Sequence, residues 1–589
     1  QHLFFYWSVI NKFNFIGCKM SFRKAHLYGN LQIYQSFYVS GKGGRNKSFK
    51  AVGYVNDLIA QGIDSPFDYA QNLVDELNNE IPSKLDKKIG DLSYSKNLGY
   101  FLIKSMFDYL DMDEILRLMS TNMNFHFLLS DFVRSMVYAQ IVNPGSKHKA
   151  FEKVMPNIQD AKSFSYNQIL DTINYIGNDY QKFVELLNIK IEEKWKRKTS
   201  KAYFDCTNYY FEIDLPKEDR QFGPSKEERH LPIIGQALLL DEDQIPLGMS
   251  LYPGNESEKP MIRESINNLK ERFDISSKIV QVADKGLNCA RNIYAAAIEA
   301  HDGYIFSKSV HGKNLSESEK KWVLLNNENN EWTEVKDECG KLLYKFKECI
   351  DTFEYHFTDN DGQYIKFKVK EKRVVSYSPS LARKQQAQIQ KQIDKAIAIS
   401  SIKQASKEEY GDSVKYVNFT SVDSNGEVIK SVPSLNQNKI KEDMDYAGYN
   451  LLVSSETKKS AQEIYDAYHG LWRIEESFRV MKTYLEARPV YLQNKESIYG
   501  HFTICYIALT ILRLLELKVF DDKLPISQIV DFIRSYNITE TLEGSYINNA
   551  VKSTVLYSVQ KRLGLAKLDN AQLRKKDVEN ILNAELYFD

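Results

Sequence analysis

Residues 202–308 constrain the fold of this chain most, because strand-forming and helix-forming stretches alternate along them. Strands are expected at 202–213, on both sides of "DEDQ" within 233–255, at 277–284 and at 303–309. Helices are expected between the later strands, at 258–273 and 288–300. Three early strands followed by alternating helix and strand predict a mixed α/β sheet.

The alternation stops after residue 308 and resumes near residue 446. The segment between them has strand patterns at 341–350, 353–359 and 364–378, clearest at Ile365, Phe367 and Val369, and then a polar helix at 380–400. A strand at 446–456 leads directly into a further helix. The simplest interpretation is one α/β domain, residues 201–308 and 446–490, split by a β-rich insertion at 309–445.

The flanking regions are mainly helical. Residues 20–200 have broad helical periodicity after a short hairpin around "GKGGRN", and residues 491–589 have helical patterns. The apolar run at 502–517 meets Arg513 after eleven residues, which favours a core helix over a membrane span. Residues 1–19 lack the basic start and cleavage site of a secretory signal, so we expect upstream translation rather than functional chain.

Composition excludes few classes of protein. The 78 basic and 78 acidic residues give a formal net charge of zero, so overall charge does not point to nucleic acid. Residues 366–403, however, contain ten Lys or Arg and two acids. A phosphate-binding sector and a solvated basic face explain this count equally well. Six scattered cysteines without a CxxC pair favour a reducing compartment over a zinc module, and we expect a cytosolic protein.

Two acids interrupt strand-forming runs. Asp205 has apolar and aromatic neighbours, and Asp284 ends the strand that begins at residue 277. A carboxylate inside an apolar run is costly unless a group binds it. Acids at strand ends are nevertheless common, so either residue alone is more readily explained as a solvated strand end.

A third acid, Glu475, lies in the helix that follows the strand at 446–456. One apolar stripe runs along this helix, formed by Leu471, Ile474, Phe478, Met481 and Leu485. The charges beside the stripe are explained as solvated surface if no other feature is considered. Three carboxylates from separate parts of one sheet would instead make an oxygen cage suited to two Mg²⁺ ions, or Mn²⁺ as a substitute. Two such ions can promote an in-line phosphoryl transfer.

Three motifs carry a family resemblance: "YFDCTNYYFE", "VADKGLNCARNI" and "YHGLWRIEESFRVMK". Together with intervening segments such as "YSPSLARKQ" and "LEARPVY", they resemble bacterial insertion-sequence DDE transposases, most closely the insertion-sequence-four family and its branch sixteen thirty-four. The resemblance runs from about Met20 to the C-terminal helices. It implies an RNase H-like catalytic core interrupted by a β-rich insertion, and DNA cleavage followed by strand transfer.

The resemblance also implies roles for individual residues. Asp205, Asp284 and Glu475 would be the catalytic metal ligands, and Tyr468 and Lys482 would contact DNA phosphate from the helix of Glu475. Steps of seven residues place Tyr468, Glu475 and Lys482 on nearly one helix face.

This chain has Leu471 where the family pattern has Arg, and Arg473 or Arg479 are candidates for the missing cation. Glu476 is a less favoured alternative ligand, because it breaks the step to Lys482. In the insertion, the residues expected to face DNA are Lys366, Lys368, Lys370 and Arg373.

The favoured function is therefore a transposase that binds the inverted-repeat ends of its element, cuts them and joins the 3′ ends to target DNA. Its partners would be double-stranded DNA and a second copy of the chain on paired ends, without a membrane, in the bacterial cytosol near the nucleoid. The N-terminal helical region would help to hold DNA. The alternatives are a domesticated or inactive DNA-binding protein of the same fold and a plain metal-dependent nuclease.

Overall fold

The computed structural model of the protein describes residues 19–588. It leaves out 28, 40–42, 80–94, 121–127, 160, 161, 163, 228, 274, 311–314, 325–331, 401–412, 421–431, 542 and 543. The chain divides into two compact units, a small one within residues 1–94 and a large one that spans 95–540 and 544–589. Each unit has its own core.

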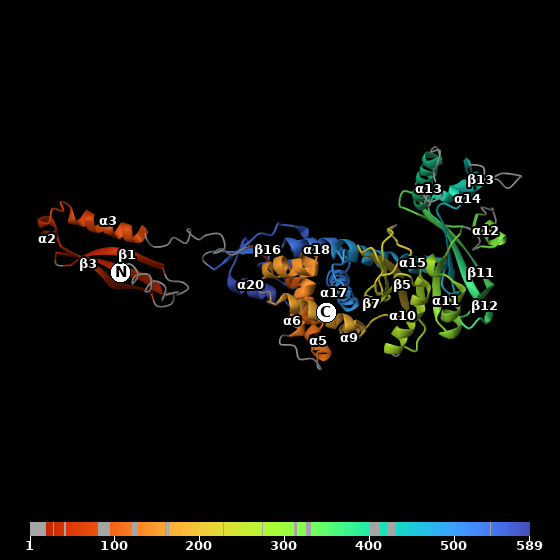
Figure 1. The fold of residues 1–589 in the computed structure, drawn as a ribbon, viewed down its shortest axis with the longest axis horizontal. Helices are drawn as coiled ribbons and strands as arrows, with labels where there is room; N and C mark the ends of the chain where they lie inside the picture. The colour runs from red at the N-terminus through yellow and green to blue at the C-terminus, as the bar shows by residue number, and fades with distance from the viewer. Residues whose placement is uncertain are drawn as a thin grey trace. The chain divides into compact units, whose positions relative to one another are not determined.

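The small unit, drawn in red in Figure 1, is an antiparallel sheet with helices. Its elements are β1 (Lys19–Leu27), β2 (Asn30–Val39), β3 (Gly43–Tyr54), α2 (Val55–Ala60) and α3 (Pro66–Asn79). Strands β2 and β3 pair from Asn30↔Tyr54 to Val39↔Gly43, which confirms the hairpin predicted around "GKGGRN". Ile33 of β2 and Val74 of α3 are buried together, so the helix covers one face of this sheet.

A nine-stranded sheet organises the large unit, in the order β10-β11-β12-β15-β9-β8-β5-β6-β7. Its strands are β5 (Lys201–Tyr210), β6 (Ile233–Leu240), β7 (Pro246–Pro253), β8 (Val280–Ala283), β9 (Gly303–Lys308), β10 (Thr333–Lys336), β11 (Leu342–Thr358), β12 (Tyr364–Tyr377) and β15 (Tyr449–Ser454). The pairs β5–β8 and β8–β9 are parallel and the other pairs are antiparallel. The predicted mixed α/β sheet is confirmed.

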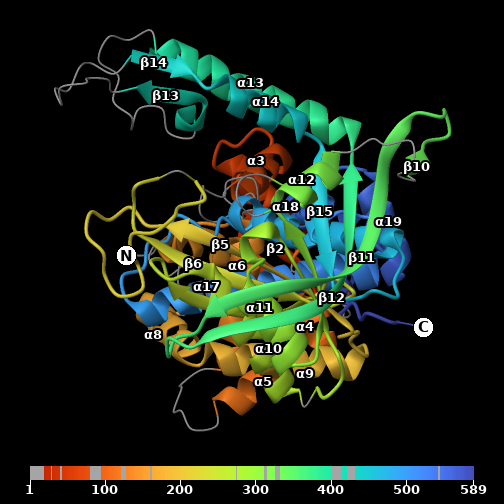
Figure 2. The ribbon, with the colours of Figure 1, turned by 90° about the vertical axis from the view of Figure 1, so that its right-hand side faces the viewer.

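Three strands of the segment 309–445, β10, β11 and β12, extend this sheet, whereas β13 (Val417–Thr420) and β14 (Val432–Leu435) form a separate pair. Strand β12 pairs with β15 from Lys372↔Ser454 to Tyr377↔Tyr449, and β11 pairs along β12. Figure 2 shows β11 and β12 as a long green hairpin, with α13 and α14 above it. The segment also contains α12 (Glu317–Leu324), α13 (Pro379–Ser400) and α14 (Gln437–Asp445).

Different helices cover the two faces of the sheet. Phe204, Leu239 and Phe306 are buried in one core cluster with residues of α10 (Glu258–Arg272) and α11 (Ala290–Tyr294). Tyr203 and Val282 belong to the other cluster, with residues of α15 (Ala461–His469) and α16 (Trp472–Arg479). Because side chains alternate along a strand, neighbouring residues of β5 point toward the helices on opposite faces of the sheet.

Helices from both ends of the chain complete this second core. They are α4 (Phe101–Tyr109), α5 (Met112–Met119), α6 (Leu129–Val142), α7 (Lys147–Lys149), α8 (Tyr166–Asn178), α9 (Tyr180–Lys194), α17 (Lys495–Leu514), α18 (Ile526–Ser535), α19 (Thr554–Leu563) and α20 (Lys575–Leu582). A four-stranded sheet, β18-β17-β16-β4, joins β4 (Ser95–Asn97) to β16 (Asn537–Glu540), β17 (Tyr546–Asn548) and β18 (Gln572–Leu573).

Helix α17 is buried at every residue from Ser497 to Leu514. This confirms the core helix that was predicted in this region. Its apolar side chains therefore contact protein on all sides. None of the described helices combines the length and the apolar character that crossing a membrane requires.

Candidate active site

Asp205 and Asp284 lie on neighbouring parallel strands. Asp205 is within β5, and Asp284 directly follows β8. The last register pair of these strands is Phe204↔Ala283, so each aspartate is the next residue on its strand. Alternation places both on the side of Tyr203 and Val282, the face covered by α15 and α16. Both aspartates are half-buried.

Glu475 projects from α16, which packs on the same face of the sheet. Ile474 and Phe478 are buried in that core, whereas Glu475 is exposed. The chain approaches β5 closely at Gly470, because a Cβ there would lie 2.6 Å from the Tyr203 ring. The structure thus brings the three predicted acids to one side of the sheet.

The helix predicted to carry Tyr468, Glu475 and Lys482 is divided into three pieces. Tyr468 is in α15, Glu475 in α16 and Lys482 in the π-helical turn η8 (Val480–Tyr484). At the first junction, the Leu471 N–H bonds to the Tyr468 carbonyl, which tightens the turn. A tight turn and a wide π turn shift the angular positions of the residues, so steps of seven no longer define one face.

Tyr468 connects α15 to the aspartates. Its hydroxyl donates a hydrogen bond of 2.8 Å to Oδ1 of Asp284. Burial raises the pKa of the Tyr468 hydroxyl, and the charge of Asp284 raises it further, so the hydroxyl keeps its proton. Tyr468 therefore fixes the orientation of the Asp284 carboxylate.

The carboxylates lie in a negative environment. Burial raises the pKa of Asp205 to about 6; nearby Lys226 opposes this rise, whereas Glu258 and Asp284 add to it. Although Glu475 is exposed, partial loss of its hydration on the core-facing side raises its pKa, and the charge of Asp284 contributes. Lys226 donates a hydrogen bond to the backbone carbonyl of Cys206 and lies 3.2 Å from Glu258. Its single charge leaves most of the acidic charge uncompensated.

The raised pKa of Asp205 predicts a pH-dependent effect on stability. An aspartate titrates near 3.9 in the unfolded chain, so ionisation of Asp205 destabilises the fold increasingly as pH rises from about 4 to about 6. We expect Asp205→Asn to be more stable than the wild type above pH 6, with the difference disappearing below pH 4. Chemical unfolding at several pH values, with EDTA present, measures this difference. A difference that does not vary with pH would contradict the assignment.

The donor chemistry of this site fits a hard divalent cation. Carboxylate oxygens are the ligands that Mg²⁺ and Mn²⁺ prefer, and burial beside like charges makes a cation favourable there. Among the residues that the structure describes, however, no group of three or more His, Cys, Asp or Glu side chains is arranged to hold a metal ion.

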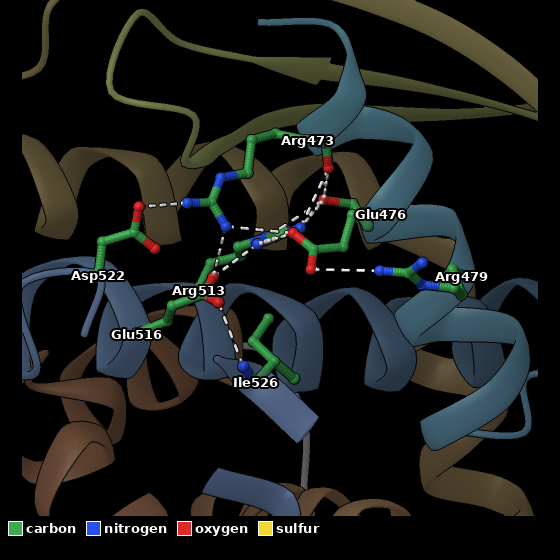
Figure 3. Close-up of polar contacts among 8 residues, drawn as sticks. Arg473, Glu476, Arg479, Arg513, Glu516, Asp522 and Ile526 are labelled. Carbon is green, nitrogen blue, oxygen red and sulfur yellow. Dashed lines mark hydrogen bonds and ion pairs between the residues drawn. The ribbon is translucent and has the colours of Figure 1, made fainter. Parts of the chain in front are cut away.

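The adjacent acid, Glu476, has a different environment. Figure 3 shows it among arginines between α16 and α17. Its carboxylate accepts from Arg513 at 2.9 Å, Arg473 at 3.2 Å and Arg479 at 3.4 Å. Burial favours the neutral acid, but Arg513 and Arg473 outweigh it and lower the pKa of Glu476. Glu476 is thus neutralised by protein cations.

Arg473 and Arg479, the candidates for the cation that Leu471 does not supply, lie in different environments. Arg473 is buried and pairs with Glu476, Glu516 and Asp522. The Arg479 side chain is 66% exposed. Leu471 itself is buried in the core. Of these residues, only Arg479 presents a cation to solvent.

Lys482 is paired near the site. Its Nζ lies 3.2 Å from Glu227, which also accepts from Arg488. Glu227 and the neighbouring Lys226 belong to the polar connection between β5 and β6, and sequence patterns gave no signal for either. Arg488 lies in the segment "LEARPVY", where no helix or strand period marks a functional residue.

The basic residues of β12 divide between its two faces. Lys366, Lys368 and Lys370 are exposed, with Lys366 2.7 Å from Glu354. Arg373 was also expected to face DNA, but it is buried and bonded to Glu371 and Glu319. Its odd number places it opposite the even-numbered lysines, and β12 is covered on both sides from Glu371 onward.

Comparisons with known proteins give one family match. A family model described as "Transposase DDE domain" matches residues 211–511, slightly more than half of the chain. Asp284 and Glu475 lie inside the matched range and Asp205 lies just before it. No curated protein matches. Among solved structures, the chain is similar to piggyBac transposase in a synaptic complex with hairpin DNA, with 9% identity, a TM-score of 0.32, and coverage of 83% of this chain and 85% of that one.

Proposed function

This chain belongs to the family of transposase DDE domains, and we propose that it is the transposase of an insertion sequence. It binds the inverted-repeat ends of the element, cuts the DNA there and joins the 3′ ends to target DNA. The observation that supports the proposal, within this family, is that Asp205 and Asp284 occupy strand positions on the face of the sheet that α16, the helix of Glu475, covers.

In this proposal, Asp205, Asp284 and Glu475 hold two divalent ions, Mg²⁺ or Mn²⁺ in its place. When bound, such ions activate the attacking oxygen and stabilise the leaving oxygen of an in-line displacement. Tyr468 keeps the Asp284 carboxylate oriented through its hydrogen bond. Lys482 contacts a DNA phosphate beside the scissile bond. Arg479, exposed on α16, is a better candidate than buried Arg473 for the cation that Leu471 does not supply.

We also propose a branch of the family and a domain organisation for this chain. The spacing of Tyr468, Glu475 and Lys482 supports membership in the insertion-sequence-four family, branch sixteen thirty-four, with Leu471 as a departure. Residues 201–308 and 446–490 would form an RNase H-like core, 309–445 its insertion, and 20–200 and 491–589 the flanking regions. Paired DNA ends require two protomers, so a homodimer is proposed, acting in the bacterial cytosol on nucleoid DNA.

The experiment that tests this function has two stages. Purified protein is incubated with Mg²⁺ and a duplex that carries the element's own end, and nicking at the end is measured. Joining of the released 3′ end to a second duplex is then measured. Nicking followed by joining supports a transposase, nicking alone supports a plain nuclease, and binding without nicking supports a domesticated DNA-binding protein. Matching inverted repeats beside the gene identify the duplex to use.

The lysines of β12 are proposed to bind DNA without reading its sequence. Replacing Lys366, Lys368 and Lys370 by Ala should weaken binding to any duplex, because phosphate contacts carry no sequence information. The slope of log K against log salt should decrease by up to about three. Fluorescence anisotropy across a range of salt concentrations measures both quantities. An unchanged slope would mean that these lysines are only a solvated face.

A further inference from the structure

Two cations near the proposed active site share one carboxylate. Lys482 of η8 lies 3.2 Å from Oε1 of Glu227, and Arg488 donates through Nη1 to Oε2 of the same side chain. Each carboxylate oxygen therefore contacts one cation. The three side chains are half-buried, at 17%, 25% and 20% exposure for Lys482, Arg488 and Glu227.

Aromatic rings and backbone contacts hold this cluster in place. Lys482 Nζ is 5.2 Å from the Tyr209 ring centroid, and Arg488 Cζ is 5.1 Å from that of Tyr210. The Asn208 side chain accepts from the Lys226 N–H and donates to the Pro224 carbonyl, which fixes the backbone beside Glu227. Glu227 therefore contacts both cations from a backbone that neighbouring hydrogen bonds hold in place.

The cations have more binding capacity than Glu227 uses. The pair of cations carries two positive charges against one carboxylate, so the cluster retains a net positive charge. In addition, the Nε of Arg488 is buried and has no hydrogen-bond partner among the described residues. A guanidinium presents donors in a fork that suits two oxygens of one anion. The net positive charge and the unused Nε donor thus allow the cluster to bind another anion in place of the Glu227 carboxylate.

We propose that Lys482 and Arg488 together bind one DNA backbone phosphate, and that Glu227 occupies this site until DNA displaces it. The proposal rests on the proposed function and adds a second phosphate-binding residue and an internal competitor. A backbone phosphate has two non-bridging oxygens, which can replace the two oxygens of Glu227. Glu227 then lowers the affinity for DNA, because its contacts with the cations must be broken before a phosphate binds.

Glu227→Gln removes the competing charge and keeps the shape of the side chain. We expect this variant to bind duplex DNA several-fold more tightly, and the slope of log K against log salt to steepen by up to about 0.9, the value of one phosphate contact. Arg488→Gln should weaken binding and make the slope shallower by a similar amount. The double variant Arg488→Gln/Glu227→Gln should not show the increase in DNA affinity that is expected for Glu227→Gln alone.

The assay is fluorescence anisotropy with a labelled duplex of arbitrary sequence, with EDTA present, between about 50 and 200 mM salt. Asp243→Asn is the matched control, because Asp243 also bridges two cations, Lys198 at 3.1 Å and Lys518 at 2.9 Å, with a side chain 22% exposed. It removes the same charge outside the proposed phosphate site. Thermal melting establishes that each variant is folded.

Tighter binding and a steeper slope in Glu227→Gln, with Asp243→Asn close to the wild type, would support the proposal. Equal behaviour of Glu227→Gln and Asp243→Asn would overturn it and leave the proposed function intact, provided that the wild type binds and nicks DNA. If folded Arg488→Gln binds like the wild type, Arg488 is not a phosphate contact and the proposal also fails. A wild type that binds no duplex would overturn both proposals.

Discussion

Asp205→Asn, Asp284→Asn and Glu475→Gln should each lower Mg²⁺-dependent nicking of the element's end on the order of 10³-fold or more, as is typical when one member of a catalytic unit is removed. Each substitution keeps the shape of the side chain and replaces one carboxylate oxygen by an amide nitrogen. Divalent ions need closely defined oxygen geometry, so the loss of one carboxylate disturbs the whole site. The fold should be retained.

DNA binding in EDTA separates a loss of catalysis from a loss of binding. The three variants should bind as tightly as the wild type or more tightly, because negative charge that faces DNA phosphate is removed. Asp466→Asn is the control, since Asp466 is exposed on α15 and bonds to the Gln462 side chain. Full activity in all three catalytic variants would overturn the mechanism. Full activity in Glu475→Gln alone would overturn only the assignment of that residue.

Residue spacing disfavours Glu476 as a metal ligand and so suggests that Glu476→Gln would leave nicking unchanged. The structure shows that this variant cannot serve as such a control. The Glu476 carboxylate accepts from Arg473 and Arg513 in the interior between α16 and α17. Its replacement would weaken the support of the helix that carries Glu475. A change in nicking by Glu476→Gln is therefore informative only when stability is measured alongside it.

Local patterns predicted the elements around the candidate site. Alternating strand and helix signals at 202–308 predicted the mixed sheet, and an acid within or at the end of an apolar run identified Asp205 and Asp284. These features depend on periods of two and 3.6 residues, which a sequence displays directly. The family match confirms the resemblance to DDE transposases. The branch sixteen thirty-four, the RNase H-like core and the metal ligands remain predictions.

Contacts between distant residues could not be predicted in the same way. Glu227 and Lys482 are far apart in the sequence, and no period of a helix or strand relates them. The same applies to Glu476 and Arg513, whose pairing depends on how α16 packs on α17. Arg373 differs, because its odd number already indicated the face opposite Lys366. The short strands β16 to β18 were missed because two to four residues are too few to show alternation.

Arg513→Met should destabilise the large unit by about 3–5 kcal/mol, the usual cost of breaking a buried ion pair by removing one partner. The Arg513 side chain is fully buried and contacts Glu516 at 2.6 Å and Glu476 at 2.9 Å. Glu516 is 1% exposed, and its Oε1 accepts from the Ile526 N–H at the start of α18 (Figure 3). Without Arg513, Glu516 and Glu476 lose a principal cation, while a methionine fills a similar volume.

Thermal and chemical unfolding of the same protein measure this loss. Arg479→Ala is the comparison, because Arg479 pairs with Glu476 at 3.4 Å from an exposed position, and such pairs contribute about 0–1 kcal/mol. Adding Glu516→Gln to Arg513→Met should recover part of the stability, because it removes a buried charge that has lost its nearer cation and keeps only Arg473 at 3.4 Å. A loss below about 1 kcal/mol in Arg513→Met would mean that this network contributes no more than a surface ion pair. If Arg513→Met loses much stability and Glu516→Gln does not reduce that loss, the loss comes from changed packing around α17 and not from the Glu516 charge.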